Sequence, residues 1–132
     1  MQELRNKSKY TGIKRIIFSA KYAIEGLIYA YKNEKSLLVH AICTITAIIL
    51  GLIFKLSPGE WSTILITLSV ILSVELLNTA IEAVVDMVTL EYNPLAKIAK
   101  DCGGGATFVV SMTGVIIAIV IFGPKVLALL GI

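Results

Sequence analysis

The distribution of hydrophobic positions divides the chain into three long apolar segments and one amphipathic segment. The apolar segments cover residues 37–54, 61–88 and 103–123, and the first and third contain no Lys, Arg, Asp or Glu. The second is apolar to Val74 and then continues with helical spacing through charged residues. A helix of about 20 apolar residues spans the hydrocarbon core of a bilayer, so the pattern predicts three transmembrane helices.

The amphipathic segment covers residues 11–31. Its apolar positions recur at helical spacing, and Lys14, Arg15, Lys21 and Glu25 fall between them. A helix with cations on its polar face lies along a membrane surface, where the cations approach anionic head groups. We therefore expect an all-α membrane protein with an N-terminal surface helix.

Short polar segments connect the predicted spans. Residues 55–60 contain Pro58-Gly59, a pair that is typical of a turn. Asn93-Pro94 indicates the end of the second helix, because the residue before a proline is biased away from the helical conformation. Residues 95–101 are then expected to form a polar link to the third span.

Composition supports the membrane assignment and bounds the size. The 132 residues favour a single domain, and only 16% of them are charged, against about 25% in an average soluble protein. The net charge of +3 does not indicate nucleic-acid binding, because the basic residues adjoin membrane spans. Cys43 and Cys102 do not form a disulfide framework, so both are expected to be free thiols.

The basic residues predict an orientation in the plasma membrane. Eight of the twelve Lys and Arg residues lie between Arg5 and Lys35, and two more, Lys97 and Lys100, follow the second span. The positive-inside rule places the N-terminus and the second loop in the cytoplasm and the C-terminus outside. The charged end of the second span would then face the cytoplasm.

A polar stripe on the second span is the candidate for chemistry. Glu75, Asn78, Glu82 and Asp86 are spaced by three, four and four residues, so they fall within an arc of roughly 80° on a helix. Counted from Trp61 at about 1.5 Å per residue, Glu75 lies about 21 Å into a core of roughly 30 Å. A carboxylate at that depth is costly unless it is protonated, paired or functional. Hydrogen bonding between helices is one explanation, but four such groups on one face favour a functional site.

The stripe belongs to a longer motif that resembles a known family. ELLNTAIEAVVD, followed by EYNPLAKIAKD, is similar to the signature of the bacterial small integral-membrane diacylglycerol kinases, a family that includes the undecaprenol kinases of Gram-positive bacteria. The similarity runs from the helix of Arg15, through Asn33-Glu34, to the third span. It implies a homotrimer of three-span protomers with composite active sites between them, in which a membrane lipid alcohol is phosphorylated by ATP with Mg²⁺.

The resemblance also implies roles for individual residues. Glu75 matches the general base for the lipid hydroxyl, and Asn78 matches a neighbouring polar group on the substrate side. Glu34 and Glu82 match carboxylates that hold the metal on ATP. The full set matched to the nucleotide is Arg15, Tyr22, Glu34, Glu82, Asp86, Lys100 and Asp101.

General chemistry agrees with these roles. Phosphoryl transfer needs Mg²⁺, a cation on the phosphates and an oriented nucleophile. The sequence contains no GxxxxGK[ST] motif, so a P-loop enzyme is excluded. Gly103-Gly104-Gly105 is interpreted as a site of close helix packing rather than a phosphate cradle.

Two departures from the proteobacterial branch favour undecaprenol over diacylglycerol as the substrate. His40 stands where proteobacterial diacylglycerol kinases carry an acid and Gram-positive relatives tend to carry histidine, and as a single histidine it makes a poor metal site. The surface helix also lacks the tryptophans of that branch. From other classes, a small ion- or proton-conducting oligomer and a non-catalytic membrane subunit remain open. The apolar stretch of residues 64–74 argues against a conduit.

Overall fold

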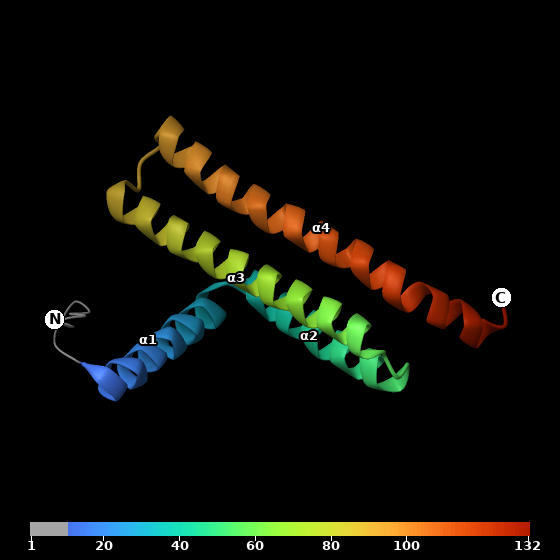
Figure 1. The fold of residues 1–132 in the computed structure, drawn as a ribbon. Helices are drawn as coiled ribbons and strands as arrows, with labels where there is room; N and C mark the ends of the chain where they lie inside the picture. Colours follow the sequence, from blue (N-terminus) through green and yellow to red (C-terminus); the bar gives the residue numbers. More distant parts are fainter. Residues whose placement is uncertain (1–10) are drawn as a thin grey trace. The chain divides into compact units, whose positions relative to one another are not determined.

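A computed structural model describes residues 11–132 of the chain, which form four helices and, within that range, no strand (Figure 1). These are α1 (Gly12–Asn33), α2 (Lys35–Ile53), α3 (Pro58–Val88) and α4 (Pro94–Leu130). The chain divides into two compact units, Met1–Asn33 and Glu34–Ile132, so α1 is separate from the other three helices. The prediction of one domain over residues 1–132 stays a prediction.

Three of the four helices are long and apolar enough to cross a membrane, namely α2, α3 and α4. The fourth, α1, is amphipathic and exposes Ile13, Ile16 and Ile17 alongside Lys14 and Arg15. The predicted fold class, three spans after an amphipathic helix, is therefore confirmed. Cys43 and Cys102 are free thiols, as expected.

Side-chain caps define where α3 and α4 begin. At α3, the Ser57 backbone N–H donates to the Glu60 carboxylate at 2.7 Å, and the Glu60 N–H donates to the Ser57 hydroxyl at 3.4 Å. At α4, the Asn93 side-chain oxygen accepts from the backbone N–H groups of Leu95, at 2.8 Å, and Ala96. These caps satisfy backbone donors that have no partner in the first turn of a helix.

The expectation of a polar link over residues 95–101 is wrong, because those residues form the first two turns of α4. Asn93-Pro94 starts a helix rather than only ending one: Pro94 needs no N–H at the first helical position, and Asn93 caps it. Helix α4 also continues past residue 123, through Pro124, to Leu130. As a result, the polar first turns of α4 lie beside the C-terminal end of α3.

Within the second unit, α3 packs against α4, which runs antiparallel to it, and against α2 (Figure 1). The best-buried core lies at the end near the α2–α3 turn, where Leu56, Ile64 and Phe122 meet. The rings of Phe54 and Phe122 lie 6.3 Å apart in this cluster. The buried apolar packing among the three helices is therefore concentrated near this end of the unit.

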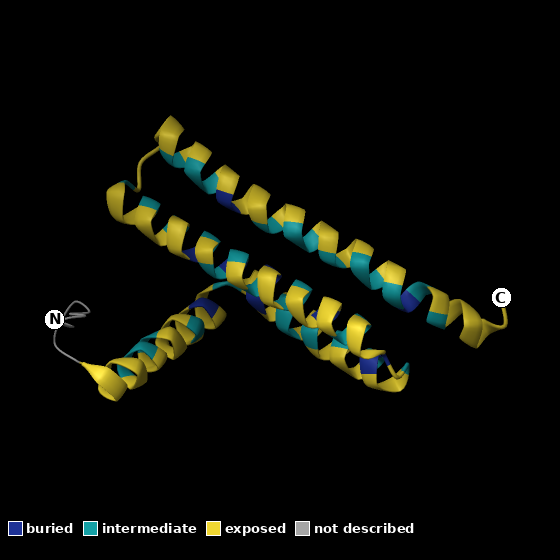
Figure 2. Cartoon of the chain, viewed as in Figure 1, coloured by how far each residue is buried: buried dark blue, intermediate teal, exposed yellow. Residues whose placement is uncertain are grey.

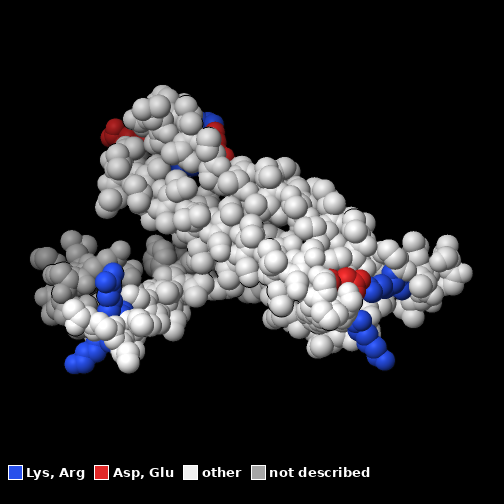
Figure 3. Space-filling model, viewed as in Figure 1, with Lys and Arg blue, Asp and Glu red and all other residues white. Residues whose placement is uncertain are grey.

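Most apolar side chains of these three helices remain exposed (Figure 2). On the face drawn in Figure 3, charged side chains of the second unit gather toward its two ends, and the surface between them is uncharged. An apolar surface of this extent is unfavourable in water. It is the surface expected of helices in lipid or in contact with other apolar helices.

Candidate active site

Glu75, the deepest residue of the polar stripe, is held by two side chains of α2. It is 6% exposed. His40 Nε2 lies 2.8 Å from Glu75 Oε1, and the Ser36 hydroxyl donates to Oε2 at 3.3 Å. Ser36 and His40 are four residues apart on α2, so they project from one face of that helix. Both oxygens of this buried carboxyl group are therefore hydrogen-bonded within one chain.

Asn78 and Glu82 form the middle of the stripe. The Asn78 amide donates to Glu82 Oε1 at 3.0 Å, along one turn of α3. The amide oxygen of Asn78 is buried and has no hydrogen-bond partner among the residues that the structure describes. It lies against Gly103 of α4, where a β-carbon would overlap it. The predicted packing role is therefore confirmed at Gly103, whereas a β-carbon at Gly104 or Gly105 would meet nothing within 4 Å.

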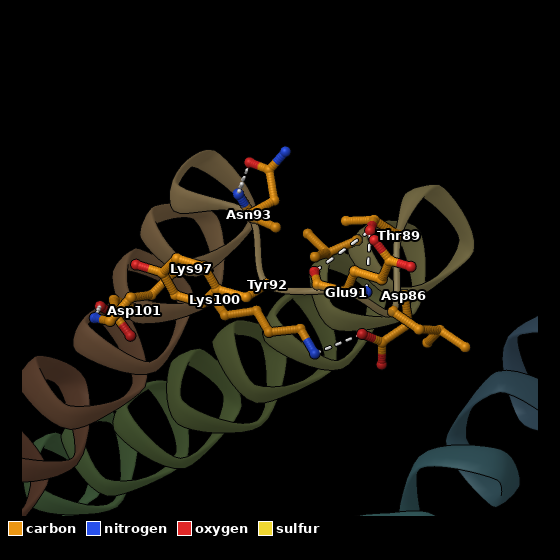
Figure 4. Close-up of a pocket in the computed structure, with 11 residues that line it drawn as sticks. Asp86, Thr89, Glu91, Tyr92, Asn93, Lys97, Lys100 and Asp101 are labelled. Atoms are coloured by element: carbon orange, nitrogen blue, oxygen red, sulfur yellow. Dashed lines mark hydrogen bonds and ion pairs between the residues drawn. The ribbon is translucent and has the colours of Figure 1, made fainter.

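At the polar end of the unit, α3 and α4 are joined by an ion pair. Lys100 Nζ lies 2.5 Å from Asp86 Oδ1, and Lys97 pairs with Asp101 along α4. The two pairs line a shallow pocket of about 290 Å³ at the α3–α4 loop (Figure 4). Its complete lining is Val85, Asp86, Thr89, Leu90, Glu91, Tyr92, Asn93, Ala96, Lys97, Lys100 and Asp101.

Three of the residues matched to the nucleotide, Asp86, Lys100 and Asp101, thus lie together in one pocket. Glu34 stands directly before α2 as its N-cap residue, with an extended backbone and no side-chain capping bond. Arg15 and Tyr22 belong to α1 in the other unit, and their nucleotide roles stay predictions.

Sequence reasoning missed the partners of Glu75. From the sequence, His40 is considered as a metal ligand and as a marker of the family branch, but not as a partner of Glu75, and Ser36 is not considered at all. The available signal was the spacing of Ser36 and His40, two polar residues one turn apart at the start of an apolar helix. The pocket residues Thr89, Tyr92 and Asn93 are not among the predicted site residues either, although Tyr92 and Asn93 lie in the motif EYNPLAKIAKD.

The carboxylates fit a metal that arrives with a nucleotide better than one enclosed by protein. Among the described residues, no group of three or more His, Cys, Asp or Glu side chains could hold a metal ion. Mg²⁺ typically takes one or two protein carboxylates and completes its shell with phosphate oxygens and water. Glu82 Oε1 accepts from Asn78, and Glu34 makes no capping bond. Each therefore retains acceptor capacity for such an ion.

The site is layered along α3. The Asp86–Lys100 pair is nearest the loop, the Asn78–Glu82 pair is next, and the Glu75 group is deepest. Glu82 and Glu75 are seven residues apart, which corresponds to about 10 Å along the helix axis. A cation near the surface and a deeper carboxylate suit a reaction between a polar reagent at the membrane boundary and a group inside the membrane.

Comparison with known proteins places the chain in a family. The family described as prokaryotic diacylglycerol kinase matches residues 21–122. An undecaprenol kinase of Bacillus subtilis is 36% identical over 120 residues, which cover 91% of this chain and 98% of that protein. Diacylglycerol kinases of Pseudomonas aeruginosa and Escherichia coli are 38% and 32% identical and cover 75% and 80% of this chain, respectively, and 80% and 87% of their own lengths. The chain therefore belongs to the prokaryotic diacylglycerol kinase family.

Proposed function

We propose that this chain transfers the γ-phosphoryl group of ATP to the hydroxyl of undecaprenol, giving undecaprenyl phosphate. Family membership makes the chain a lipid kinase. The choice of undecaprenol is carried by one observation: the match to an undecaprenol kinase extends over nearly the whole length of both proteins.

Glu75 is the proposed general base for the lipid hydroxyl. It lies on a membrane-spanning helix and is more deeply placed than Glu82, so a hydroxyl at the end of a membrane lipid can approach it from within the bilayer. Asn78, one turn closer to the loop, is proposed to contact the same substrate end. A positioned base of this kind contributes about 10² to 10⁴ in rate.

The nucleotide is proposed to bind at the α3–α4 end of the unit. Lys100 supplies a cation for the phosphates, and Asp86 and Asp101 lie beside it in the same pocket. Glu34 and Glu82 are the proposed ligands of Mg²⁺, which neutralises developing charge on the phosphates when it is bound. The remaining proposed nucleotide contacts are Arg15 and Tyr22 of α1.

A homotrimer with sites between protomers is part of this proposal. Three spanning helices in one chain leave the loop pocket shallow and most apolar side chains exposed, so neighbouring copies have surface to cover. The charge asymmetry of the sequence supports a cytoplasmic α3–α4 loop. That orientation puts the pocket on the side of ATP.

Diacylglycerol is the competing substrate, because the Pseudomonas aeruginosa and Escherichia coli relatives are named diacylglycerol kinases. The deciding experiment measures ADP release by the purified enzyme with undecaprenol or diacylglycerol at equal mole fractions in the same lipid. We expect kcat/KM to be at least about tenfold higher for undecaprenol, a difference of about 1.4 kcal/mol. Equal or higher kcat/KM for diacylglycerol would make this a diacylglycerol kinase, and no ADP release with either would overturn both.

A further inference from the structure

The two oxygens of the Glu75 carboxylate have unequal partners. Oε1 lies 2.8 Å from His40 Nε2, whereas Oε2 accepts from the Ser36 hydroxyl at 3.3 Å. The His40 side chain is 21% exposed, and Ser36 is exposed. A bond of 3.3 Å is long for an O–H donor, whose preferred distance to oxygen is about 2.7–2.8 Å. Oε1 is thus held more firmly than Oε2.

The chemical nature of the two partners increases the difference between Oε1 and Oε2. An ionised carboxylate only accepts hydrogen bonds, so the imidazole donates to it through Nε2–H. A charge-assisted bond of this length is roughly twice as strong as a neutral one. The Ser36 hydroxyl is the same functional group as the end of a lipid alcohol, and it already occupies the place from which a hydroxyl donates to Oε2.

We propose that His40 is the positioning residue of Glu75, fixing the carboxylate through Oε1, and that Oε2 is the atom that takes the proton of the lipid hydroxyl. Ser36 marks the place of that hydroxyl and is displaced when the lipid binds. This inference rests on the proposed role of Glu75 as the base.

In the proposed step, proton transfer to Glu75 accompanies phosphoryl transfer to the lipid. The lipid O–H proton moves to Glu75 Oε2 while the lipid oxygen forms a bond to the γ-phosphorus of ATP. The bond from that phosphorus to the bridging oxygen breaks, and ADP leaves with the electron pair. Glu75 later returns the proton to solvent, and His40 keeps its own proton throughout.

The first test asks whether His40 positions Glu75 through its N–H donor or is needed only for folding. His40→Gln keeps an N–H donor near the place of Nε2, whereas His40→Asn and His40→Leu do not. Misplacing a reacting group by about 1 Å can cost about 10²-fold. We expect kcat to fall by about 10- to 100-fold in His40→Leu and His40→Asn. It should stay within about threefold in His40→Gln, with KM for ATP unchanged in all three. If His40→Leu does not fold, kcat is compared between His40→Gln and His40→Asn alone.

The control is Thr44→Val, one turn further along the same helix, which should leave kcat unchanged. Full kcat in His40→Asn, or equal losses in His40→Gln and His40→Asn, would overturn the positioning role. Ser36→Ala should lower KM for the lipid by about two- to tenfold, because the lipid no longer displaces a hydrogen bond. A raised lipid KM would show instead that Ser36 binds the substrate directly.

The second test is a double-mutant cycle between His40 and Glu75. If His40 acts only through Glu75, His40→Leu (His40→Asn if the Leu variant does not fold) should change kcat by less than about threefold in the Glu75→Gln background. Losses that multiply would overturn the inference while leaving Glu75 as the base. Full turnover in Glu75→Gln alone would instead overturn the proposed role of Glu75, so the two failures are distinguishable.

Discussion

The side-chain amide of Asn78 on α3 links two neighbours at once: its nitrogen donates to Glu82, and its buried oxygen lies directly against Gly103 on α4. A β-carbon at position 103 would overlap that oxygen, so any other residue there forces the Asn78 side chain to shift. The proposed metal ligand Glu82 is therefore oriented by the packing of α3 on α4.

Gly103→Ala is expected to push Asn78 away from Glu82 and to reduce turnover. Overpacking of this kind typically also costs about 1–3 kcal/mol of stability. The matched control is Gly104→Ala, whose β-carbon meets nothing within 4 Å. The free energy of unfolding of that control should increase by about 0.5–1 kcal/mol, since alanine favours a helix more than glycine does. Thermal unfolding and ADP release check both, and equal behaviour of the two variants would contradict the packing argument.

Glu75→Gln is expected to lower kcat by about 10² to 10⁴, because the amide keeps the shape of the side chain but cannot take a proton. Affinity for ATP should change little, since the residue lies about 10 Å deeper than Glu82. Nucleotide binding and turnover measured on the same preparation check this. Lost ATP binding would assign Glu75 to the metal, and retained turnover would leave it a structural group.

Glu34→Gln and Glu82→Gln are each expected to raise the Mg²⁺ concentration needed for half-maximal turnover, because an amide is a weaker ligand for a hard cation than a carboxylate. Turnover measured across an Mg²⁺ titration checks this. Glu60→Gln is the control, since Glu60 lies at the opposite end of α3 and pairs with Lys125 at 2.9 Å. A variant with normal activity at low Mg²⁺ would remove that residue from the metal site.

Lys100→Met is expected to raise KM for ATP by about tenfold or more, the equivalent of losing about 1.4 kcal/mol of binding. The methionine keeps the length of the stem but loses the charge that faces the pocket and Asp86. Lys97→Met removes a charge from the same pocket lining, where Lys97 pairs with Asp101 along α4, and a smaller effect is expected. Equal effects would show that the pocket needs only net positive charge.

A reporter fused after Ile132 is expected to read as outside the cytoplasm. The reason is the concentration of Lys and Arg before the first span and after the second. A second reporter inserted in the α3–α4 loop should read as cytoplasmic. The opposite pattern would put the pocket on the side away from ATP and would overturn the proposed nucleotide site.

The helices themselves could be predicted from sequence because each depends on local composition. A bilayer requires long uninterrupted apolar segments, and the three that cross it were located to within a few residues, apart from the ends of α4. The start of α4 was predicted too late in the sequence, because Asn93-Pro94 is equally compatible with the end of one helix and the start of the next. Its capping bonds decide between the two, and they form only when the chain turns at that point.

The shared helix face and the relative depths of Glu75, Asn78, Glu82 and Asp86 also followed from the sequence. In a helix, the spacing between residues fixes both the direction in which each points and its position along the axis. Which partner each residue meets on another helix did not follow. His40 with Glu75, Gly103 with Asn78 and Lys100 with Asp86 are separated by 35, 25 and 14 positions in the sequence. Such pairs arise only when α2, α3 and α4 pack in one register, so the tertiary structure decides them.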